Sequence, residues 1–259
     1  MCGFVGFSGR LEKRQEILEK MMSRIIHRGP DSAGEFIGDD IALGFRRLSI
    51  IDLDGGAQPI YNEDKSVVTV YNGEIYNFME LRRELEEAGH RFTTRTDTEV
   101  LVHGWEEYGE RLIPKLRGMF ALLVYDMKNH KLLGARDYFG IKPFYYYRTE
   151  GGDYLFGSEI KSFLEHPEFV KKLNRRALRP YLTFQYSALD ETFFEGVYKL
   201  PPAHYFVLDL DKKSKLEPVR YWDIDFTEKP GDFDALTSDI DKTVRESVEA
   251  HKISDVKVG

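Results

Sequence analysis

The chain has 259 residues, with 37 Lys and Arg against 44 Asp and Glu, so its net charge is −7 when histidine is neutral. Phosphate binding requires a surplus of basic side chains on one face, and this acidic composition argues against a nucleic-acid-binding protein. Hydrophobic residues make up 42% of the chain, which is enough for a folded core. The single cysteine, Cys2, excludes an internal disulfide framework and a cysteine-rich metal site.

The chain carries no pattern typical of secretion or of a membrane span. Met1 to Arg10 is glycine-rich and then charged, without the apolar segment that follows basic residues in a secretory signal. The longest apolar run, Met119 to Tyr125, is too short to cross a bilayer. We therefore expect no membrane association, and a location in the cytoplasm, where thiols stay reduced.

The pattern of apolar residues predicts many short strands with a few helices between them. Strands are expected at residues 2–8, 41–47, 48–53, 67–71, 119–126, 131–136, 144–147, 154–156, 204–210 and 216–222. Helices are expected at residues 12–26, 78–88, 101–108, 158–164 and 175–183. Asn72-Gly73 is expected to form a turn after its strand, and Thr96 or Asp97 to cap the helix that follows. Runs of adjacent strands with segregated helices indicate an α+β fold with antiparallel sheets.

The end of the chain has a different pattern. Residues 226–233 form a linker that contains Pro and Gly, and an amphipathic helix is expected to follow, with apolar residues every four positions. Residues 254–259 read as the start of a strand, and a helix with half a strand cannot bury a core of its own. We therefore expect residues 2–225 to form one domain and residues 234–259 to begin a second, truncated one in a longer polypeptide.

Cys2 directly follows the initiator methionine, and this position has a chemical consequence. If Met1 is removed, as is expected when the second residue is small, one residue carries both a thiol and a free α-amine. An amine with a pKa of about 7.7 to 8.0 can accept the proton of a thiol with a pKa of about 8.5. Cys2 would then be a nucleophile with its own base, whereas the ordinary alternative is a small buried thiol at a strand start.

Several polar residues match the groups of a free amino acid. Arg47 offers a bidentate fork to a carboxylate, and Glu74 and Asp97 offer negative charge to an ammonium group. Asn72 and Gly73 offer a side-chain amide and a backbone N–H to a developing oxyanion. Each has an ordinary alternative, an Asn-Gly turn or a helix N-cap. Together they describe an amino-acid pocket with the Cys2 thiol at its far end.

A cysteine-histidine protease is the obvious rival interpretation. His27, in a Gly-Pro turn, is the most site-like histidine. The other six are expected to be surface or capping residues on helix ends and polar turns: His90, His103, His130, His166, His204 and His251. No protease nucleophile motif surrounds Cys2, and the protease interpretation is disfavoured.

Several short motifs follow one another along the chain. They are Met1-Cys2-Gly3, His27-Arg28-Gly29-Pro30-Asp31, Arg47-Leu48-Ser49-Ile50-Ile51-Asp52, Asn72-Gly73-Glu74-Ile75-Tyr76-Asn77 and Asp97-Thr98-Glu99. In this order they resemble the class II glutamine amidotransferases. Later motifs narrow the resemblance to the glutaminase domain of the glutamine-hydrolysing asparagine synthetases: Gly118-Met119-Phe120-Ala121, Arg136-Asp137, Gly140-Ile141-Lys142-Pro143 and Ser158-Glu159. The resemblance extends from Cys2 to about Tyr205.

This resemblance implies an N-terminal-nucleophile hydrolase fold, a four-layer αββα sandwich. It implies that Cys2 attacks the side-chain amide of L-glutamine, giving a γ-glutamyl thioester and ammonia, and that water then releases glutamate. Positions matching Asn72 and Gly73 form the oxyanion hole in the family, and those matching Arg47, Glu74 and Asp97 hold the α-carboxylate and α-amine. The segment Arg47, Leu48, Ser49, Ile50 and Ile51 lines the pocket. No metal is needed, and residues 27–31 are expected to be a structural loop over the site.

In the family a second domain uses ATP and Mg²⁺ to activate aspartate, which receives the ammonia, and members are often homodimers. Its Ser-Gly-Gly-x-Asp-Ser phosphate motif does not occur in these 259 residues, so no cofactor is expected for this part of the chain. Two alternatives remain open from the sequence. The ammonia acceptor could be another compound, such as a sugar phosphate or a peptide carboxylate. A chain that retains Met1 could also be a catalytically silent interaction domain with the same fold.

Overall fold

The computed structural model describes residues 2–48, 56–187, 189–228 and 231–252. Its strands are β1 (Gly3–Ser8), β2 (Ser32–Ile37), β3 (Ile41–Arg47), β4 (Ile60–Tyr61), β5 (Val67–Ile75), β6 (Gly118–Asp126), β7 (Lys131–Arg136), β8 (Tyr145–Arg148), β9 (Tyr154–Gly157), β10 (Val197–Lys199), β11 (His204–Asp209) and β12 (Val219–Arg220). Its α-helices are α1 (Arg14–Ser23), α2 (Phe78–Glu87), α3 (Val100–Tyr108), α4 (Arg175–Phe184) and α5 (Phe233–Ala250). Its 3₁₀-helices are η1 (Ile26–Arg28), η2 (Gly109–Lys115) and η3 (Ile160–Glu165).

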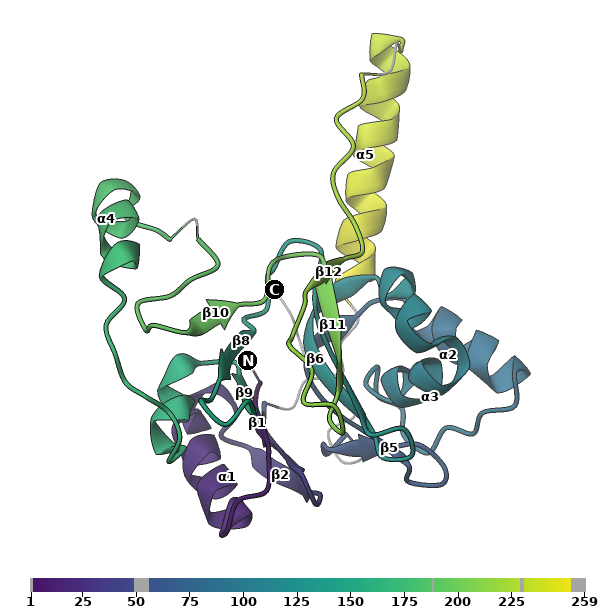
Figure 1. Cartoon of the computed structure of the whole chain (residues 1–259). Coiled ribbons are helices and arrows are strands. Elements are labelled where there is room, and N and C mark those ends of the chain that lie inside the picture. Colours follow the sequence, from purple (N-terminus) through teal and green to yellow (C-terminus); the bar gives the residue numbers. More distant parts are fainter. Residues whose placement is uncertain (1, 49–55, 188, 229–230, 253–259) are drawn as a thin grey trace.

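The strands form two antiparallel sheets that face each other between two layers of helices (Figure 1). The first sheet has the order β10-β8-β9-β1-β3-β2, and the second has the order β12-β11-β7-β6-β5-β4. Helices α1 and η3 cover the outer face of the first sheet, and α2 and α3 cover that of the second (Figure 1). This arrangement confirms the predicted αββα sandwich.

The space between the sheets is filled by alternate residues of the central strands. Phe4 of β1, Phe45 of β3 and Val70 of β5 belong to this inner core, in which Phe144 makes an edge contact with Phe4 at a centroid distance of 5.3 Å. Residues between them in sequence point outward against the helices, as Tyr71 does. Because these strands are buried on both faces, their sequences are nearly continuous apolar runs. Each fully buried Phe or Val contributes about 1.5 to 3 kcal/mol to the stability of the fold.

The strands at 41–47 and 131–136 agree with the sequence prediction, whereas β2, β4 and β10 were not predicted. All three are edge strands, of two to six residues, and such short strands carry little periodicity. The predicted helix at 12–26 divides into α1 and η1, and the one at 158–164 is the 3₁₀-helix η3. The strand predicted at 48–53 lies outside the described residues except for Leu48, and that at 254–259 lies wholly outside them.

The predicted turn at Asn72-Gly73 is wrong, because β5 continues through both residues to Ile75. Asn72 pairs with Ala121 and Gly73 pairs with Phe120 of β6. A Cβ atom at Gly73 would lie 2.2 Å from the carbonyl oxygen of Met119. The glycine therefore serves the close approach of two strands rather than a change of direction.

The predicted C-terminal amphipathic helix is α5, which projects away from the sandwich (Figure 1). Its apolar residues Leu236, Ile240, Val244 and Val248 are all exposed. His251, which follows the last residue of α5, packs its ring 4.1 Å from that of Tyr76, which follows β5.

The expectation that the remaining histidines lie at the surface is wrong for His103 and His166. His103 is 0% exposed and His166 is 3% exposed. The ring of His166 contacts Phe7 edge-on at a centroid distance of 4.9 Å, and its Nδ1 accepts a hydrogen bond from the Glu168 backbone N–H at 3.3 Å. Both rings are therefore part of the packed interior and not helix caps.

His166 gives a testable pH dependence of stability. Burial lowers the pKa of His166 from 6.5 to about 4, because the charged imidazolium loses its hydration. The unfolded chain therefore binds this proton more readily, and the group's contribution is lost as the pH falls from 6.5 to 4. We expect His166→Gln to remove about 3 kcal/mol of the decline in unfolding free energy over this range, measured by urea titration at several pH values. The exposed His204→Gln variant should keep the parent's slope, and an unchanged slope in His166→Gln would contradict the assignment.

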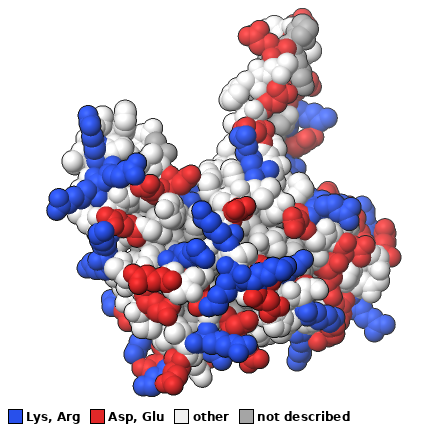
Figure 2. Space-filling model, viewed as in Figure 1, with Lys and Arg blue, Asp and Glu red and all other residues white. Residues whose placement is uncertain are grey.

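Within the described ranges, none of the helices combines the length and apolar character needed to traverse a lipid bilayer. Basic and acidic side chains are interspersed over the face drawn in Figure 2. On this face the mixture does not form the continuous basic surface that phosphate backbones bind.

Candidate active site

One small cavity, of about 50 Å³, collects most of the residues that the sequence analysis selected. It is lined by Cys2, Phe45, Arg47, Leu48, Gly56, Gln58, Tyr71, Gly73, Glu74, Thr96, Asp97 and Thr98. Ser49, Ile50 and Ile51, which were predicted to line the pocket, lie outside the described residues.

The alternation of the strands explains how these side chains meet. Cys2 directly precedes β1 and lies on the same inner face as Phe4, two residues later in the chain. Arg47 continues the inner face of Phe45 on β3. Asn72 and Glu74 continue the face of Val70 on β5. At one end of the sandwich, three neighbouring strands thus replace apolar residues with polar ones, and these side chains face the space between the sheets.

The Cys2 thiol is fixed against the backbone of Leu48. Its Sγ donates to the Leu48 carbonyl oxygen and accepts from the Leu48 N–H, both at 3.3 Å. Burial raises the pKa of the thiol, and the Leu48 N–H together with the charges of Arg47 and Lys142 offset part of that rise. These groups would stabilise the thiolate once a base removes the proton.

The segment 27–31 contacts Cys2 through Arg28. Arg28 Nε donates to the Cys2 carbonyl oxygen at 2.8 Å, and Arg28 also pairs with Glu159 at 3.1 Å. His27 is exposed and its Nε2 lies 2.8 Å from the same Glu159 carboxylate. A Cβ atom at Gly29 would lie 2.3 Å from the backbone of Arg46, so only glycine lets this segment lie against β3. The structure agrees with the expected structural loop.

Asp97 and Glu74 place two carboxylates on one cavity. Asp97 is buried, and its Oδ2 accepts from the Tyr71 hydroxyl at 2.8 Å and from the Ile75 N–H at 2.9 Å. Burial raises the pKa of Asp97, and these hydrogen bonds oppose the rise. Burial also raises the pKa of Glu74, and the negative charge of Asp97 adds to the effect. An ammonium group placed at this end of the cavity would relieve both penalties.

The prediction that Thr96 or Asp97 caps the following helix is wrong. Helix α3 starts at Val100, its N-cap is Glu99, and neither Thr96 nor Asp97 bonds its first turn. The Asp97 carboxylate points instead toward β5, because the backbone of Ile75 and the hydroxyl of Tyr71 supply the donors.

Arg47 is 7% exposed and lines the cavity beside Cys2. A guanidinium is the side chain best suited to a carboxylate, because its planar fork donates two parallel hydrogen bonds. It therefore provides a buried positive group on the cavity whose other charged walls are Glu74 and Asp97.

Asn72 and Gly73 supply hydrogen-bond donors on β5. Asn72 is 1% exposed, and within the described part of the chain its buried Nδ2 has no hydrogen-bond partner. A buried amide without a partner costs about 1 to 3 kcal/mol, and Asn72 itself is not among the residues that line the cavity, although its neighbours Tyr71, Gly73 and Glu74 are. Its side chain lies on the face of β5 that looks toward the first sheet.

Residues 1–222 match the model of the glutamine amidotransferase domain. The chain belongs to this family. The amidotransferase chain is 39% identical over its whole length to asparagine synthetase [glutamine-hydrolyzing] 1 of Bacillus subtilis strain 168, of which it covers 41%, and 34% identical to asparagine synthetase [glutamine-hydrolyzing] 3 of the same strain, of which it covers 42%. It thus spans about two fifths of the length of these curated relatives.

A solved structure supports the fold of the amidotransferase domain. The glutamine phosphoribosylpyrophosphate amidotransferase of B. subtilis, complexed with ADP and GMP, superimposes with a TM-score of 0.61 at 18% identity. The match covers 85% of this chain and 49% of that one. At this identity the likeness shows the fold alone, and it agrees with the two facing antiparallel sheets described above.

The selection of site residues from the sequence of the amidotransferase domain missed Lys142. Lys142 is 6% exposed and close enough to Glu74 and Cys2 for its charge to affect both. Arg136 and Asp137 build the loop that carries it: Arg136 donates to the carbonyl oxygens of Gly140 and Lys142, and Asp137 accepts from the backbone N–H of Lys142 at 2.9 Å. The motif at residues 140–143 marked this segment in the sequence, but a motif does not show in which direction the Lys142 side chain points.

Tyr71 and Gln58 were also missed. Gln58 pairs with the backbone of Tyr71 in both directions, at 2.7 and 3.0 Å, and Tyr71 in turn holds Asp97. No local pattern marks either residue, because their role depends on contacts between separate segments.

Proposed function

We propose that the amidotransferase domain hydrolyses L-glutamine to glutamate and ammonia through a thioester on Cys2. The observation that carries the proposal is a single cavity whose walls include the Cys2 thiol, the Arg47 guanidinium and the carboxylates of Glu74 and Asp97. These groups complement the side-chain amide, the α-carboxylate and the α-ammonium of one amino acid.

Acyl transfer begins with the thiol of Cys2. Removal of Met1 frees the Cys2 α-amine, which takes the thiol proton as the sulfur attacks the δ-carbon of glutamine. The carbonyl oxygen becomes an oxyanion, which accepts hydrogen bonds from Asn72 Nδ2 and the Gly73 N–H. The tetrahedral intermediate collapses as the ammonium form of the amine returns its proton to the leaving nitrogen. Ammonia departs, and water then adds to the thioester, giving glutamate and the free thiol.

The α-ammonium and α-carboxylate groups of glutamine are recognised by side chains of opposite charge. Glu74 and Asp97 offer the ammonium group two negative oxygens in a buried place, and Arg47 offers the carboxylate a bidentate partner. A neutral substrate would bring no positive charge to the buried carboxylates of Glu74 and Asp97, so the cost of burying them would not be offset and the substrate would bind poorly.

We propose further that the ammonia is used in asparagine synthesis by a synthetase domain of the same, longer polypeptide. The curated relatives are named glutamine-hydrolysing asparagine synthetases, and this chain spans about two fifths of them. ATP and Mg²⁺ would belong to that second domain, and α5 with its exposed apolar stripe would be part of the connection to it.

The proposal is tested by incubating the Met1-processed chain with L-glutamine and following glutamate and ammonia together. We expect the two products in equal amounts, with little turnover of D-glutamine or L-asparagine. Intact mass measurement confirms the processing, and a preparation that retains Met1 serves as the matched control. Glutamate release no faster than in the control would overturn the proposal.

A further inference from the structure

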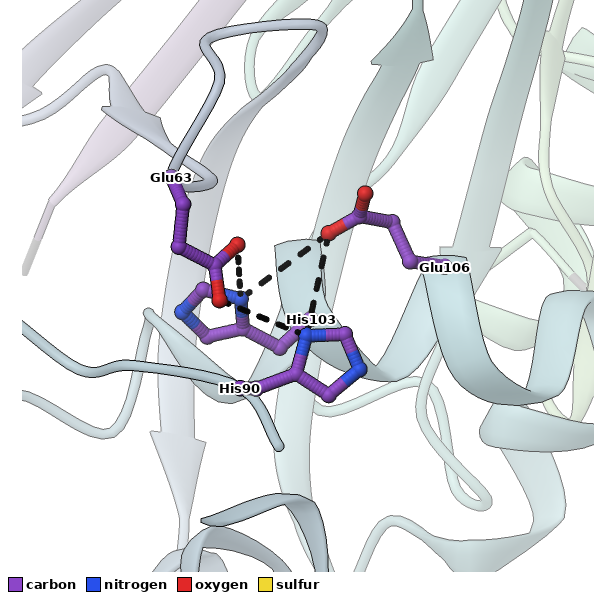
Figure 3. Close-up of side chains that lie close together, drawn as sticks. All are labelled: Glu63, His90, His103 and Glu106. Atoms are coloured by element: carbon purple, nitrogen blue, oxygen red, sulfur yellow. Dashed lines mark ion pairs between the residues drawn. The ribbon is translucent and has the colours of Figure 1, made fainter. Parts of the chain in front are cut away.

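A second cluster of chemically active side chains lies on the α2/α3 side of the second sheet, at residues that the proposed amidotransferase chemistry does not use. It consists of Glu63, His90, His103 and Glu106, whose donor atoms all lie within 4.8 Å of one another (Figure 3). We propose that these four side chains form a zinc-binding site.

The spacing of the donor atoms fits a tetrahedral ion. His103 Nδ1 lies 3.2 Å from a Glu63 oxygen, His90 Nδ1 lies 3.5 Å from the other Glu63 oxygen, and both Nδ1 atoms lie 3.9 Å from Glu106 Oε2. Zinc bonds of about 2.0 to 2.2 Å place tetrahedral ligands about 3.3 to 3.6 Å apart. The donors need only small movements to surround one ion.

His103 provides an independent indication of a ligand. Its side chain is 0% exposed, yet neither ring nitrogen makes a hydrogen bond of normal geometry within the described chain. Its Nδ1 points toward Glu63 and Glu106, into the cluster (Figure 3). Buried polar atoms are nearly always satisfied, so these nitrogens call for a partner, and an ion bound by the cluster would supply one to Nδ1.

A second carboxylate lies near the outer ring nitrogen of each imidazole, close enough to form a hydrogen bond after a small movement. His103 Nε2 lies 3.5 Å from Glu99, and His90 Nε2 lies 3.6 Å from Glu107. A carboxylate on one ring nitrogen fixes the tautomer that leaves a lone pair on the other, as in carboxylate–histidine–zinc triads. Glu99 is itself held by the backbone N–H groups of Thr93 and Thr94, both at 2.7 Å.

The four donor groups, two imidazoles and two carboxylates, favour zinc over divalent cations that prefer oxygen ligands. Two neutral imidazoles and two carboxylates balance the charge of a divalent cation, and imidazole nitrogen favours Zn²⁺ over Mg²⁺ or Ca²⁺. Glu63 and Glu106 side chains are 34% and 27% exposed, so the ion can enter from solvent.

The chain brings the four ligands together from three segments. Glu63 precedes β5, and His90 follows the end of α2, where Gly89 with φ of +107° turns the chain. His103 and Glu106 share one face of α3. A bound ion would link these segments and hold α3 against β5, close to the turn that carries Asp97.

The test is zinc binding by the whole chain in a Cys2→Ser background, which removes the only thiol, after chelator stripping and removal of any affinity tag. We expect one equivalent of Zn²⁺ by calorimetry, and a rise in melting temperature of about 5 to 10 °C at a free zinc concentration of one hundred times Kd. Co²⁺ should bind at the same site with the visible absorption of a tetrahedral N₂O₂ complex.

The decisive variants replace exposed ligands, since substitution of the buried His103 could unfold the chain. Glu63→Gln and Glu106→Gln should each weaken zinc binding by at least about tenfold, whereas Glu87→Gln on exposed α2 should bind as the parent does. No saturable one-to-one binding, or equal affinity in all three variants, would overturn the proposal and leave an ion-pair network only. Because the readout is metal binding, failure here is distinct from failure of glutamine hydrolysis.

Discussion

Replacing Cys2 with alanine is expected to lower the kcat for glutamine hydrolysis by at least about 10⁴-fold. Cys2 is the only cysteine of the chain, and the remaining hydroxyl groups on the cavity are far weaker nucleophiles at neutral pH. When an enzyme that works through an acyl intermediate loses its nucleophile, nearly all of its rate enhancement disappears, and only the part due to substrate binding and oxyanion stabilisation remains. The measurement is glutamate release by the Met1-processed protein under saturating glutamine.

The same substitution should leave binding and folding intact, which separates a chemical role from a structural one. The thiol contacts the Leu48 backbone through two weak hydrogen bonds of 3.3 Å, so their loss costs little stability. Glutamine should therefore still bind Cys2→Ala in calorimetry, with an affinity near that of the parent. Hydrolysis by Cys2→Ala within tenfold of the parent rate would show that another group attacks the amide.

The fold was predictable to the extent that strands are buried on both faces. The runs at 41–47 and 131–136 match β3 and β7 because continuous apolar character is what a central strand requires. Short edge strands such as β4 and β10 have two or three residues, and their pairing is decided by the neighbouring strand rather than by their own sequence.

Two errors share one cause: a local signal was overridden by a contact distant in sequence. Asn72-Gly73 has the composition of a turn, but β6 lies alongside it and Gly73 is needed there for close approach. His103 was assigned to a helix end at the surface, yet it lies in the apolar run Val100 to Trp105 and is packed against Phe92 and His90 at centroid distances of 4.5 and 5.1 Å.

The residues that line the candidate site were easier to predict than the residues that hold them in position. Cys2, Arg47 and Glu74 could be selected because each complements one group of a free amino acid: the side-chain amide, the α-carboxylate and the α-ammonium. Strand alternation then brings them to one cavity. Lys142 depends on the cage made by Arg136 and Asp137, a set of backbone hydrogen bonds that no spacing in the sequence specifies.

Asn72→Ala is expected to show a loss of activity without a loss of stability. Removing one oxyanion donor raises the barrier by about 2.7 to 4 kcal/mol, so kcat should fall by about 10² to 10³. Asn72 Nδ2 is buried without a partner in the described chain, so its deletion should leave the unfolding free energy unchanged or raise it by up to about 1 kcal/mol. The measurements are steady-state kinetics and urea denaturation on one preparation.

Asn129→Ala is the matched control, because Asn129 lies on the turn after β6, at the end of that strand away from Gly118 and the cavity. Its side chain donates to Asp126 at 2.8 Å, so alanine should lower the unfolding free energy by about 0.5 to 1.5 kcal/mol while kcat stays at the parent value. Asn72→Ala should therefore change kcat and not lower the unfolding free energy, whereas Asn129→Ala should lower the unfolding free energy and not change kcat. A large loss of stability in Asn72→Ala, with kcat unchanged for the folded fraction, would mean that the amide is a structural group and that the oxyanion is stabilised elsewhere.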